Sequence, residues 1–352
     1  MPPPEPPTRL RAFGPGRVNL IGEHTDYNGG LALPFAISRG VVVDAVAQDD
    51  LVIRARATDL GEEFAFAVTQ REREHGWRAF VIGMVAELEA VGVDVAGASL
   101  EIRGDVPRGA GLSSSAALEV ALCIALIELA GATPEEPGRV ELARVCARVE
   151  NEWVGAQTGL LDQLASLCGQ PDAALLIDFA TLELQDVPLK LGDWRLVVLD
   201  SGERHEHAHG GYNQRREECA KACELLGVRT LSEADPAAAE ALPEPLNRRA
   251  RHVLGENERV RDAVTALLAQ DMLTLGELLD ASHASLRDAY EISTPAVEAT
   301  IARLEQAGAT GARIIGGGFG GCALGLFAPG TSPPEDAIEV HPGPGAHLLA
   351  TD

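Results

Sequence analysis

The chain has 352 residues, 46% of them hydrophobic, and a formal net charge of −24 at pH 7. Its length predicts two domains that share one function, because a single hydrophobic core rarely serves so many residues. The acidity excludes nucleic acid and anionic membranes as expected partners, since phosphate surfaces require a basic stripe that this sequence does not contain.

The first residues, MPPPEPPTRL, lack the basic and apolar regions of a signal peptide, and no apolar run approaches the roughly 20 residues that cross a bilayer. We therefore expect a cytoplasmic protein that begins with a disordered or extended segment over residues 1–13. The six cysteines form no CxxC pair, which is typical of reduced, buried thiols.

Short strands are predicted in the first part of the chain, where β-branched and alternating apolar residues recur between turn residues. We expect them over residues 37–47, 51–57, 62–68 and 98–107. Apolar residues at helical spacing, together with good helix formers, predict helices in the same part of the chain. These are expected over residues 77–91, 116–130, 140–153 and 160–168.

A polar passage near Lys190 separates strand-like runs at 173–180 and 194–202, and we place a domain boundary there. The remainder is mainly helical, with predicted helices over residues 214–226, 246–252, 256–269, 273–286 and 295–307. The chain closes with a strand pair over 312–327 and a tail rich in proline and glycine.

The first stretch of interest is GPGRVNLIGEHTDYNGG, residues 14–30. It places Arg17, Glu23, His24 and Asp26 within ten residues around a short apolar run, and glycines flank the stretch on both sides. The alternatives are a plain turn and a binding site.

The second stretch is DVPRGAGLSSSAALEV, residues 105–120, which has the order strand, glycine-rich loop, helix. This order points the free N–H groups of the helix start outward and makes an anion site that needs no lysine. The serines at 113, 114 and 115 either cap the helix or face a phosphate or a metal. A P-loop and a protein-kinase lysine are excluded, because the only lysines are Lys190 and Lys221 and neither follows a glycine.

The third stretch, GGGFGGC at residues 316–322, has glycines in the G-x-G-x-x-G spacing of dinucleotide enzymes, at positions 316, 318 and 321. The residues that follow, CALGLF, continue as a strand, and too little chain remains for a βαβ unit, so this interpretation fails. What remains is a loop where backbone approaches another loop or a ligand closely.

Asp162 lies in the first turn of the predicted helix 160–168, and Glu150 ends the preceding one. Asp162 either complements the helix dipole or serves a function. Its leucine neighbours at 160, 161 and 164 imply a partly buried face, where a carboxylate requires a partner.

Taken together, these stretches resemble the galactokinase family of the GHMP kinase superfamily. GRVNLIGEHTDYNGG is similar to the galactokinase signature, GAGLSSSAALE to the ATP loop of the superfamily and GGGFGGC to its third motif; YNQRREEC and SHASLRDAYEIS fit as well. The resemblance implies an α+β, two-domain GHMP kinase fold with the active site in the cleft between an N-terminal domain, residues 14–190, and a C-terminal domain, residues 191–352.

The resemblance further implies ATP-dependent phosphorylation of the anomeric hydroxyl of α-D-galactose to galactose 1-phosphate. Asp162 matches the catalytic aspartate and Arg17 the arginine beside it. The matched sugar-binding residues are Glu23, His24, Asp26, Gly159 and Tyr212. Carboxylates and imidazole at short intervals suit the hydroxyls of a hexose, each of which both donates and accepts hydrogen bonds.

The residues that match the ATP loop are Gly109, Ala110, Gly111, Leu112, Ser113, Ser114, Ser115 and Ala116. Ser115 and Glu150 match the Mg²⁺ ligands, as hard oxygen donors. We expect galactose and MgATP as the partners, and a monomer or weak dimer.

Three alternatives stay open. His205, His207 and His209 alternate in a way that could chelate zinc on a strand. The protein could be a non-catalytic sensor of galactose and ATP, although such sensors lose residues of the serine loop. It could also be a GHMP kinase that acts on another sugar or a small alcohol. The segment 328–345 is shorter than is usual in the family, which affects no matched site residue.

Overall fold

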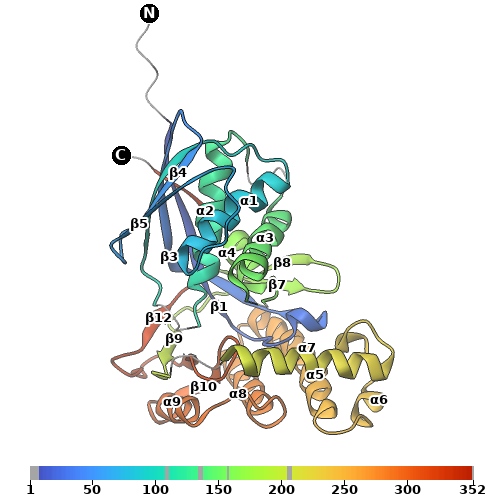
Figure 1. Ribbon diagram of the computed structural model, residues 1–352. Coiled ribbons are helices and arrows are strands. Elements are labelled where there is room, and N and C mark those ends of the chain that lie inside the picture. The colour runs from blue at the N-terminus through green and yellow to red at the C-terminus, as the bar shows by residue number, and fades with distance from the viewer. Residues whose placement is uncertain (1–7, 108–110, 134–137, 157, 204–207, 351–352) are drawn as a thin grey trace, which may run out of the picture.

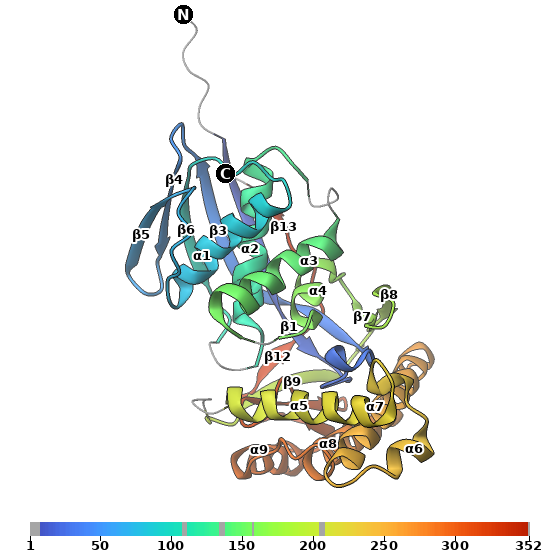
Figure 2. The same ribbon diagram turned by 45° about the vertical axis from the view of Figure 1, so that its right-hand side comes forward.

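The computed structural model describes residues 8–350 except 108–110, 134–137, 157 and 204–207. Figure 1 shows an upper part, in which helices cover a large twisted sheet, stacked on a lower part that is mainly helical. The view in Figure 2 separates the sheet of the upper part from its helices, which lie on one of its faces. The helices and sheets of these two parts agree with the predicted α+β, two-domain class.

The upper sheet has the strand order β13-β1-β3-β6-β4-β5. Its strands are β1 (Arg9–Asn19), β3 (Pro34–Ala47), β4 (Val52–Ala57), β5 (Glu62–Ala67), β6 (Ala98–Gly104) and β13 (His347–Leu349). The helices over it are α1 (Trp77–Ala90), α2 (Ser114–Leu129), α3 (Arg139–Arg148) and α4 (Leu161–Cys168). Helix α2 is apolar on nearly all sides because it is the central helix, in contact with β1, β3 and the other three helices.

The lower part contains a sheet with the strand order β10-β11-β9-β12. Its strands are β9 (Arg195–Asp200), β10 (Ala309–Ile314), β11 (Cys322–Phe327) and β12 (Ile338–Val340). Its helices are α5 (Ala208–Leu226), α6 (Pro236–Glu240), α7 (Leu246–Ala269), α8 (Met272–Asp288) and α9 (Pro295–Gln306). A Cβ added to Gly311 would lie 2.1 Å from the carbonyl oxygen of Gly276, so α8 packs directly on the backbone of β10.

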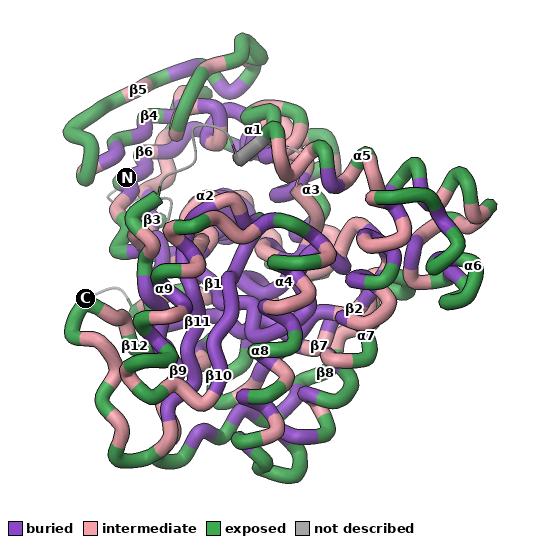
Figure 3. Tube along the Cα trace, turned by 90° about the horizontal axis from the view of Figure 1, so that it is seen from below, coloured by how far each residue is buried: buried purple, intermediate pink, exposed green. Residues whose placement is uncertain are grey.

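The two parts share a hydrophobic core. One buried cluster joins Val18 and Phe35, from the first forty residues, with Leu196, Leu275 and Leu324 of the lower part. Figure 3 shows buried residues along β1, β10 and β11. A small sheet, β2-β7-β8, lies beside this core; its strands are β2 (Leu31–Ala32), β7 (Ala173–Asp178) and β8 (Glu183–Pro188). The C-terminal strand β13 returns to the upper sheet and pairs with β1, while the domain boundary at residue 190 stays a prediction.

Some predicted elements differ from the structure. The helices expected over 246–252 and 256–269 are one continuous helix, α7, because packing outweighs the cost of about 1 kcal/mol for Gly255 inside a helix. The helix expected over 140–153 changes after Arg148 into a π-helical segment, Val149–Val154. In the part of the chain that is described, no helix is long and apolar enough to span a membrane.

Candidate active site

A cavity of about 400 Å³ lies where the three glycine-marked stretches meet. Its walls include these residues predicted for the site: Arg17, Glu23, His24, Asp26, Gly111, Leu112, Ser113, Ser114, Ser115, Glu150, Gly159, Asp162 and Tyr212. Gly316, Gly317 and Gly318 of the third stretch line it as well. Ala116 is buried below the loop and does not line the cavity, and Gly109 and Ala110 fall outside the described residues. The fold thus collects segments from five places in the sequence around one space.

Asp162 is held from two sides. Its Oδ1 accepts a hydrogen bond from Nε of Arg17 at 2.7 Å and forms an ion pair with Nη2 of Arg17 at 2.6 Å, and its Oδ2 accepts a hydrogen bond from the hydroxyl of Ser113. Arg17 also donates to the carbonyl of Gly111, which ties the ion pair to the glycine-rich loop. Ser113 precedes α2 but makes no side-chain cap, so the capping interpretation of this serine is wrong.

Glycines in β1 explain why Arg17 reaches the serine loop. A Cβ on Gly14 would lie 2.2 Å from the carbonyl oxygen of Ala117, and one on Gly16 would lie 2.6 Å from that of Leu112. Real Cβ atoms do not approach backbone so closely, so only glycine lets α2 and its preceding loop rest on β1. The same contact places the start of α2, with its free N–H groups, at the cavity wall.

The GEHTDYNGG loop, residues 22–30, connects β1 to β2 and contains a short 3₁₀ turn, Asp26–Asn28. The hydroxyl of Thr25 shares its proton between the carbonyl of Gly22, at 2.9 Å, and that of Leu31 at the start of β2, at 2.8 Å, and so keeps the loop closed. His24 adopts a left-handed conformation with φ of 60°, and its Nδ1 lies 2.8 Å from the hydroxyl of Tyr27.

Glu23 is a buried carboxyl beside the third stretch. It accepts a hydrogen bond from the backbone N–H of Gly316 at 2.8 Å, and Arg313 lies 3.3 Å away. Burial raises its pKa, and the nearby cations Arg313 and Arg17 act in the opposite direction. The first and third stretches therefore meet through Glu23.

Asp26 lines the cavity together with Asp162. Burial raises its pKa to about 6, and the negative charge of Asp162 adds to the rise. A Cβ on Gly159 would lie 1.8 Å from Asp26 Oδ2, so a residue with a side chain at 159 would displace this carboxyl. Tyr212, from α5, closes the same side, and a Cβ on Gly317 would lie 3.2 Å from its ring.

Glu150 belongs to a buried acidic group next to the serines. It accepts hydrogen bonds from Thr158 at 2.8 Å and from Gln163 at 2.9 Å. The same Gln163 amide donates to Glu119 at 3.0 Å. Burial is the main cause that raises the pKa of both glutamates, and each also lies near other acids. A cation near Glu150 would relieve this repulsion.

The oxygens of Ser115 and Glu150 fit a magnesium ion. Both line the cavity, and a hydrogen bond from Ser115 stabilises the Glu150 carboxylate. Within the described ranges, no three His, Cys, Asp or Glu side chains are grouped to hold a metal. Mg²⁺ takes few protein ligands and completes its shell with phosphates and water, so two hard oxygens are consistent with it. His205 and His207, and the side chain of His209, from the zinc alternative, lie outside what the structure describes.

A second cavity of about 820 Å³ adjoins the first through Ser114 and Ser115. Its wall includes the side chains of Trp77, Phe80 and Leu118. This second space, whose wall also carries charged side chains such as Glu62 and Arg78, therefore meets the first at the serine loop.

Four buried residues behind the cavity escaped the sequence analysis: His252, Glu256, Tyr290 and Arg313. Arg313 donates from Nη1 to the carbonyls of Asn19 at 3.0 Å and Leu20 at 2.9 Å. The sequence signal that could have identified Arg313 is its position as a charged residue inside the apolar strand ARII, because a buried arginine requires partners. His252 and Glu256 gave no comparable signal, since polar residues are ordinary in an amphipathic helix.

Three family models match the chain. They are the galactokinase galactose-binding signature over residues 4–46, the GHMP kinases N terminal domain over 79–170 and the GHMP kinases C terminal over 263–341. A galactokinase of Roseiflexus sp. is 43% identical over 328 residues, which cover 89% of this chain and 82% of the relative. A galactokinase of Mycobacterium bovis is 43% identical over 319 residues, 89% of this chain and 87% of the relative.

The chain belongs to the galactokinase family of the GHMP kinases. The crystal structure of the Lactococcus lactis galactokinase in complex with galactose superposes with a TM-score of 0.88 at 32% identity, over 97% of this chain and 95% of the other. The Methanococcus jannaschii mevalonate kinase shares the fold, with a TM-score of 0.67 at 15% identity. The predicted family is confirmed. All three model matches supply residues to the cavity described above.

Proposed function

We propose that this chain transfers the terminal phosphoryl group of ATP to the anomeric hydroxyl of α-D-galactose. The observation that carries the proposal is Asp162, fixed between Arg17 and Ser113 in a cavity whose other wall is the GEHTDYNGG loop. A hexose between the two would present its hydroxyls to the loop and its reducing end to Asp162.

Asp162 faces the reacting hydroxyl. As the sugar oxygen bonds to the terminal phosphorus and the bond from that phosphorus to the bridging oxygen of ADP breaks, the carboxylate of Asp162 accepts the proton of the hydroxyl or its hydrogen bond. Arg17 forms an ion pair with Asp162 and neutralises negative charge that develops beside this pair during the transfer. Catalysis of this kind consists mostly of positioning and charge neutralisation, because little covalent chemistry falls to the protein.

The phosphates of ATP occupy the start of α2, where free backbone N–H groups and the helix dipole favour anions. The nucleoside would then lie in the second cavity, beside Trp77 and Phe80, since Ser114 and Ser115 line both spaces. Ser115 and Glu150 would hold Mg²⁺, which supplies charge neutralisation for the phosphates when bound.

Sugar selectivity follows from the buried acids. Glu23 and Asp26 are both enclosed. A sugar that leaves either acid without a hydrogen bond therefore binds more weakly, because an unpaired buried polar group costs free energy. We expect galactose to be strongly preferred over glucose, its C4 epimer.

The test is a panel of galactose, glucose, N-acetylgalactosamine and mevalonate, each incubated with MgATP, with product identified by mass spectrometry. Galactose 1-phosphate is the expected product. The variant Asp162→Asn should retain galactose binding, measured by calorimetry, and lose turnover by a factor on the order of 10²–10⁴. A preference for another acceptor would overturn the substrate assignment, and tight galactose binding without turnover by the wild-type protein would indicate the sensor alternative.

A further inference from the structure

The sequence contains three tyrosines, Tyr27, Tyr212 and Tyr290, and all of them surround His24. The ring centroids lie 5.9 Å, 5.3 Å and 4.7 Å from that of His24, respectively. The three come from the GEHTDYNGG loop, from α5 and from the segment after α8. The proposed reaction gives Tyr290 no role, yet it is completely buried here.

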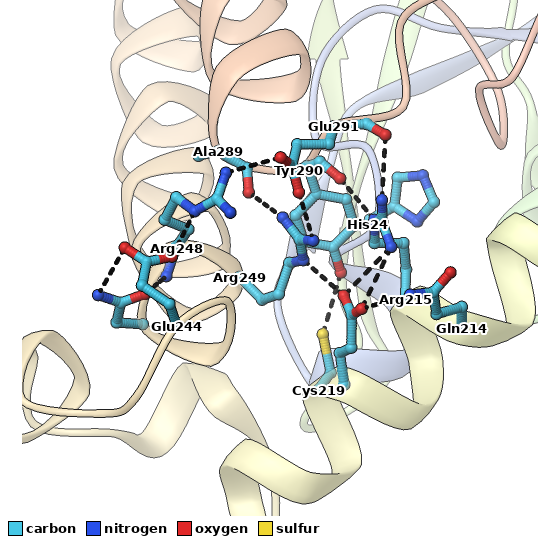
Figure 4. Close-up of polar contacts among 12 residues, drawn as sticks. His24, Gln214, Arg215, Cys219, Glu244, Arg248, Arg249, Ala289, Tyr290 and Glu291 are labelled. Carbon is cyan, nitrogen blue, oxygen red and sulfur yellow. Dashed lines mark hydrogen bonds and ion pairs between the residues drawn. The ribbon is translucent and has the colours of Figure 1, made fainter.

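A continuous chain of hydrogen bonds runs through this cluster. The amide nitrogen of Asn28 lies 3.7 Å from the sulfur of Cys219, and that sulfur lies 3.0 Å from the hydroxyl of Tyr290. The hydroxyl of Tyr290 lies 2.9 Å from that of Tyr27, which in turn lies 2.8 Å from Nδ1 of His24. Figure 4 shows the contact between Cys219 and Tyr290 at the centre of this chain.

The direction of the chain follows from its first member. The amide nitrogen of Asn28 can only donate, and each thiol or hydroxyl after it carries one proton. If every group donates to the next, then Cys219 donates to Tyr290, Tyr290 to Tyr27, and Tyr27 to Nδ1 of His24. In the reverse direction Cys219 would accept twice while its own proton had no acceptor in the chain. The forward direction satisfies each member.

Tyr290 is held in this position by buried arginines. Nε of Arg215 donates to the carbonyl of Tyr290 at 2.6 Å, and Arg249 donates to the carbonyl of the preceding residue, Ala289. Arg249 also pairs with Glu218 at 2.6 Å and Glu291 at 2.7 Å. Figure 4 shows these side chains gathered around Tyr290 from two helices and the segment after α8. The backbone at Tyr290 is therefore held in place, and its side chain is completely buried.

The other ring nitrogen, Nε2, is left without a partner in the described part of the protein. His24 lines the cavity, and its Nε2 is buried near the backbone of Gly317 without a hydrogen bond of normal geometry. Burial lowers the pKa of His24 to about 3, so the ring is neutral and carries one proton. Which nitrogen carries it depends on the bond that the other one makes.

We propose that Tyr27, Tyr290 and Cys219 are positioning residues that fix His24 as the tautomer with its proton on Nε2, so that His24 donates a hydrogen bond to an oxygen of the bound sugar. The role of the sugar rests on the proposed function, whereas the tautomer is a property of the free protein. The chain of hydrogen bonds also fixes the plane of the ring, since its acceptor Nδ1 has one defined partner.

The first test is ¹⁵N NMR of the imidazole groups in the free protein, with the His24 signals assigned by their loss in His24→Gln. We expect Nδ1 of His24 to have the shift of an unprotonated nitrogen and Nε2 that of a protonated one. A proton on Nδ1 would overturn the inference, whatever the protein phosphorylates. If the tautomer is as expected but galactose is not a substrate, the proposed function fails and the tautomer assignment stands.

The second test uses sugars in which one hydroxyl at a time is replaced by fluorine, which only accepts, or by hydrogen, which does neither. At the position that His24 contacts, the fluoro sugar should bind more tightly than the deoxy sugar, and this difference should disappear in His24→Ala. Equal affinities at every position would overturn the proposed donor role.

Variants of the chain test its positioning role. Tyr27→Phe should raise the KM for galactose about tenfold, the loss of one buried hydrogen bond, and leave the KM for ATP unchanged. Cys219→Ala should have a smaller effect in the same direction. The matched control is Cys223→Ala, one turn further along α5 and outside the chain of hydrogen bonds. Equal changes in both KM values, or a wild-type KM for galactose in Tyr27→Phe, would contradict the positioning role.

Discussion

At the scale of single residues, the cavity is lined by acids whose ionised form is disfavoured by burial. Asp26 is the clearest case, because burial and the nearby Asp162 raise its pKa from 3.8 to about 6. A backbone hydrogen bond at Tyr27 opposes this rise only in part, and the carboxyl lines the cavity, where a sugar hydroxyl can donate to it. Gly159 is required at its side, since a Cβ there would occupy the position of Oδ2.

The raised pKa predicts a pH dependence of galactose binding. Above about pH 6 Asp26 is ionised and both of its oxygens can accept from sugar hydroxyls, and below it the carboxyl becomes protonated and loses part of its accepting capacity. The affinity for galactose should therefore fall as the pH is lowered through about 6. Calorimetric titration without ATP between pH 5 and pH 8 measures this affinity, and Asp26→Asn serves as the control. An unchanged pH profile in that variant would mean that another group is responsible.

At the scale of elements, α7 acts as the support of the GEHTDYNGG loop. Nε2 of His252 lies 3.1 Å from the carbonyl of Glu23, Glu256 accepts from the N–H of Gly22 at 3.0 Å, and Asn257 accepts from the N–H of Leu31 at 2.9 Å. Although burial raises the pKa of Glu256, His252, Arg259 and Arg313 together lower it to about 2, so the buried carboxylate stays charged.

Replacing Glu256 with glutamine should destabilise the fold and the loop together. The change leaves Arg259, 2.7 Å away, without its buried anion, and breaking such a pair costs about 3–5 kcal/mol. Urea denaturation should show that loss, and the remaining folded protein should have a higher KM for galactose. Glu258→Gln is the matched control, on the same helix with an exposed side chain, and should change the free energy of unfolding by about 0.5 kcal/mol or less. Similar losses in both variants would contradict the supporting role of α7.

The support of the loop by α7 could not be predicted from the sequence, whereas the stretches that form the cavity could. Glycines and clustered polar residues mark the three stretches locally, since the conformation of a loop depends on its own residues. The role of His252 and Glu256 depends on contacts with residues more than 220 positions away in the sequence. The buried face of their helix is mostly apolar, but it also includes the polar residues that bind the loop. Periodicity predicts that a helix exists there but not which polar residues it buries.

At the scale of the whole molecule, an acidic chain has to bind an acidic nucleotide. With a net charge of −24, the average field opposes ATP, so the proposed ATP site relies on local groups, the N–H groups at the start of α2 and the cation of Arg17. The architecture gathers both at the junction of the upper and lower parts. The cavity takes its walls from β1, α2 and α4 above and from α5 and the turn before β11 below.

The core that joins the two parts predicts how the molecule unfolds. Because one buried cluster contains Val18 and Phe35 together with Leu275 and Leu324, neither part can unfold without exposing the side chains that the other packs against. Differential scanning calorimetry should therefore show a single transition, and galactose at 100 times its Kd should stabilise it by about 2.7 kcal/mol. Glucose at the same concentration is the control and should move the transition far less. Two resolved transitions, only one of them shifted by galactose, would mean that the parts unfold independently and that the sugar is bound by one of them alone.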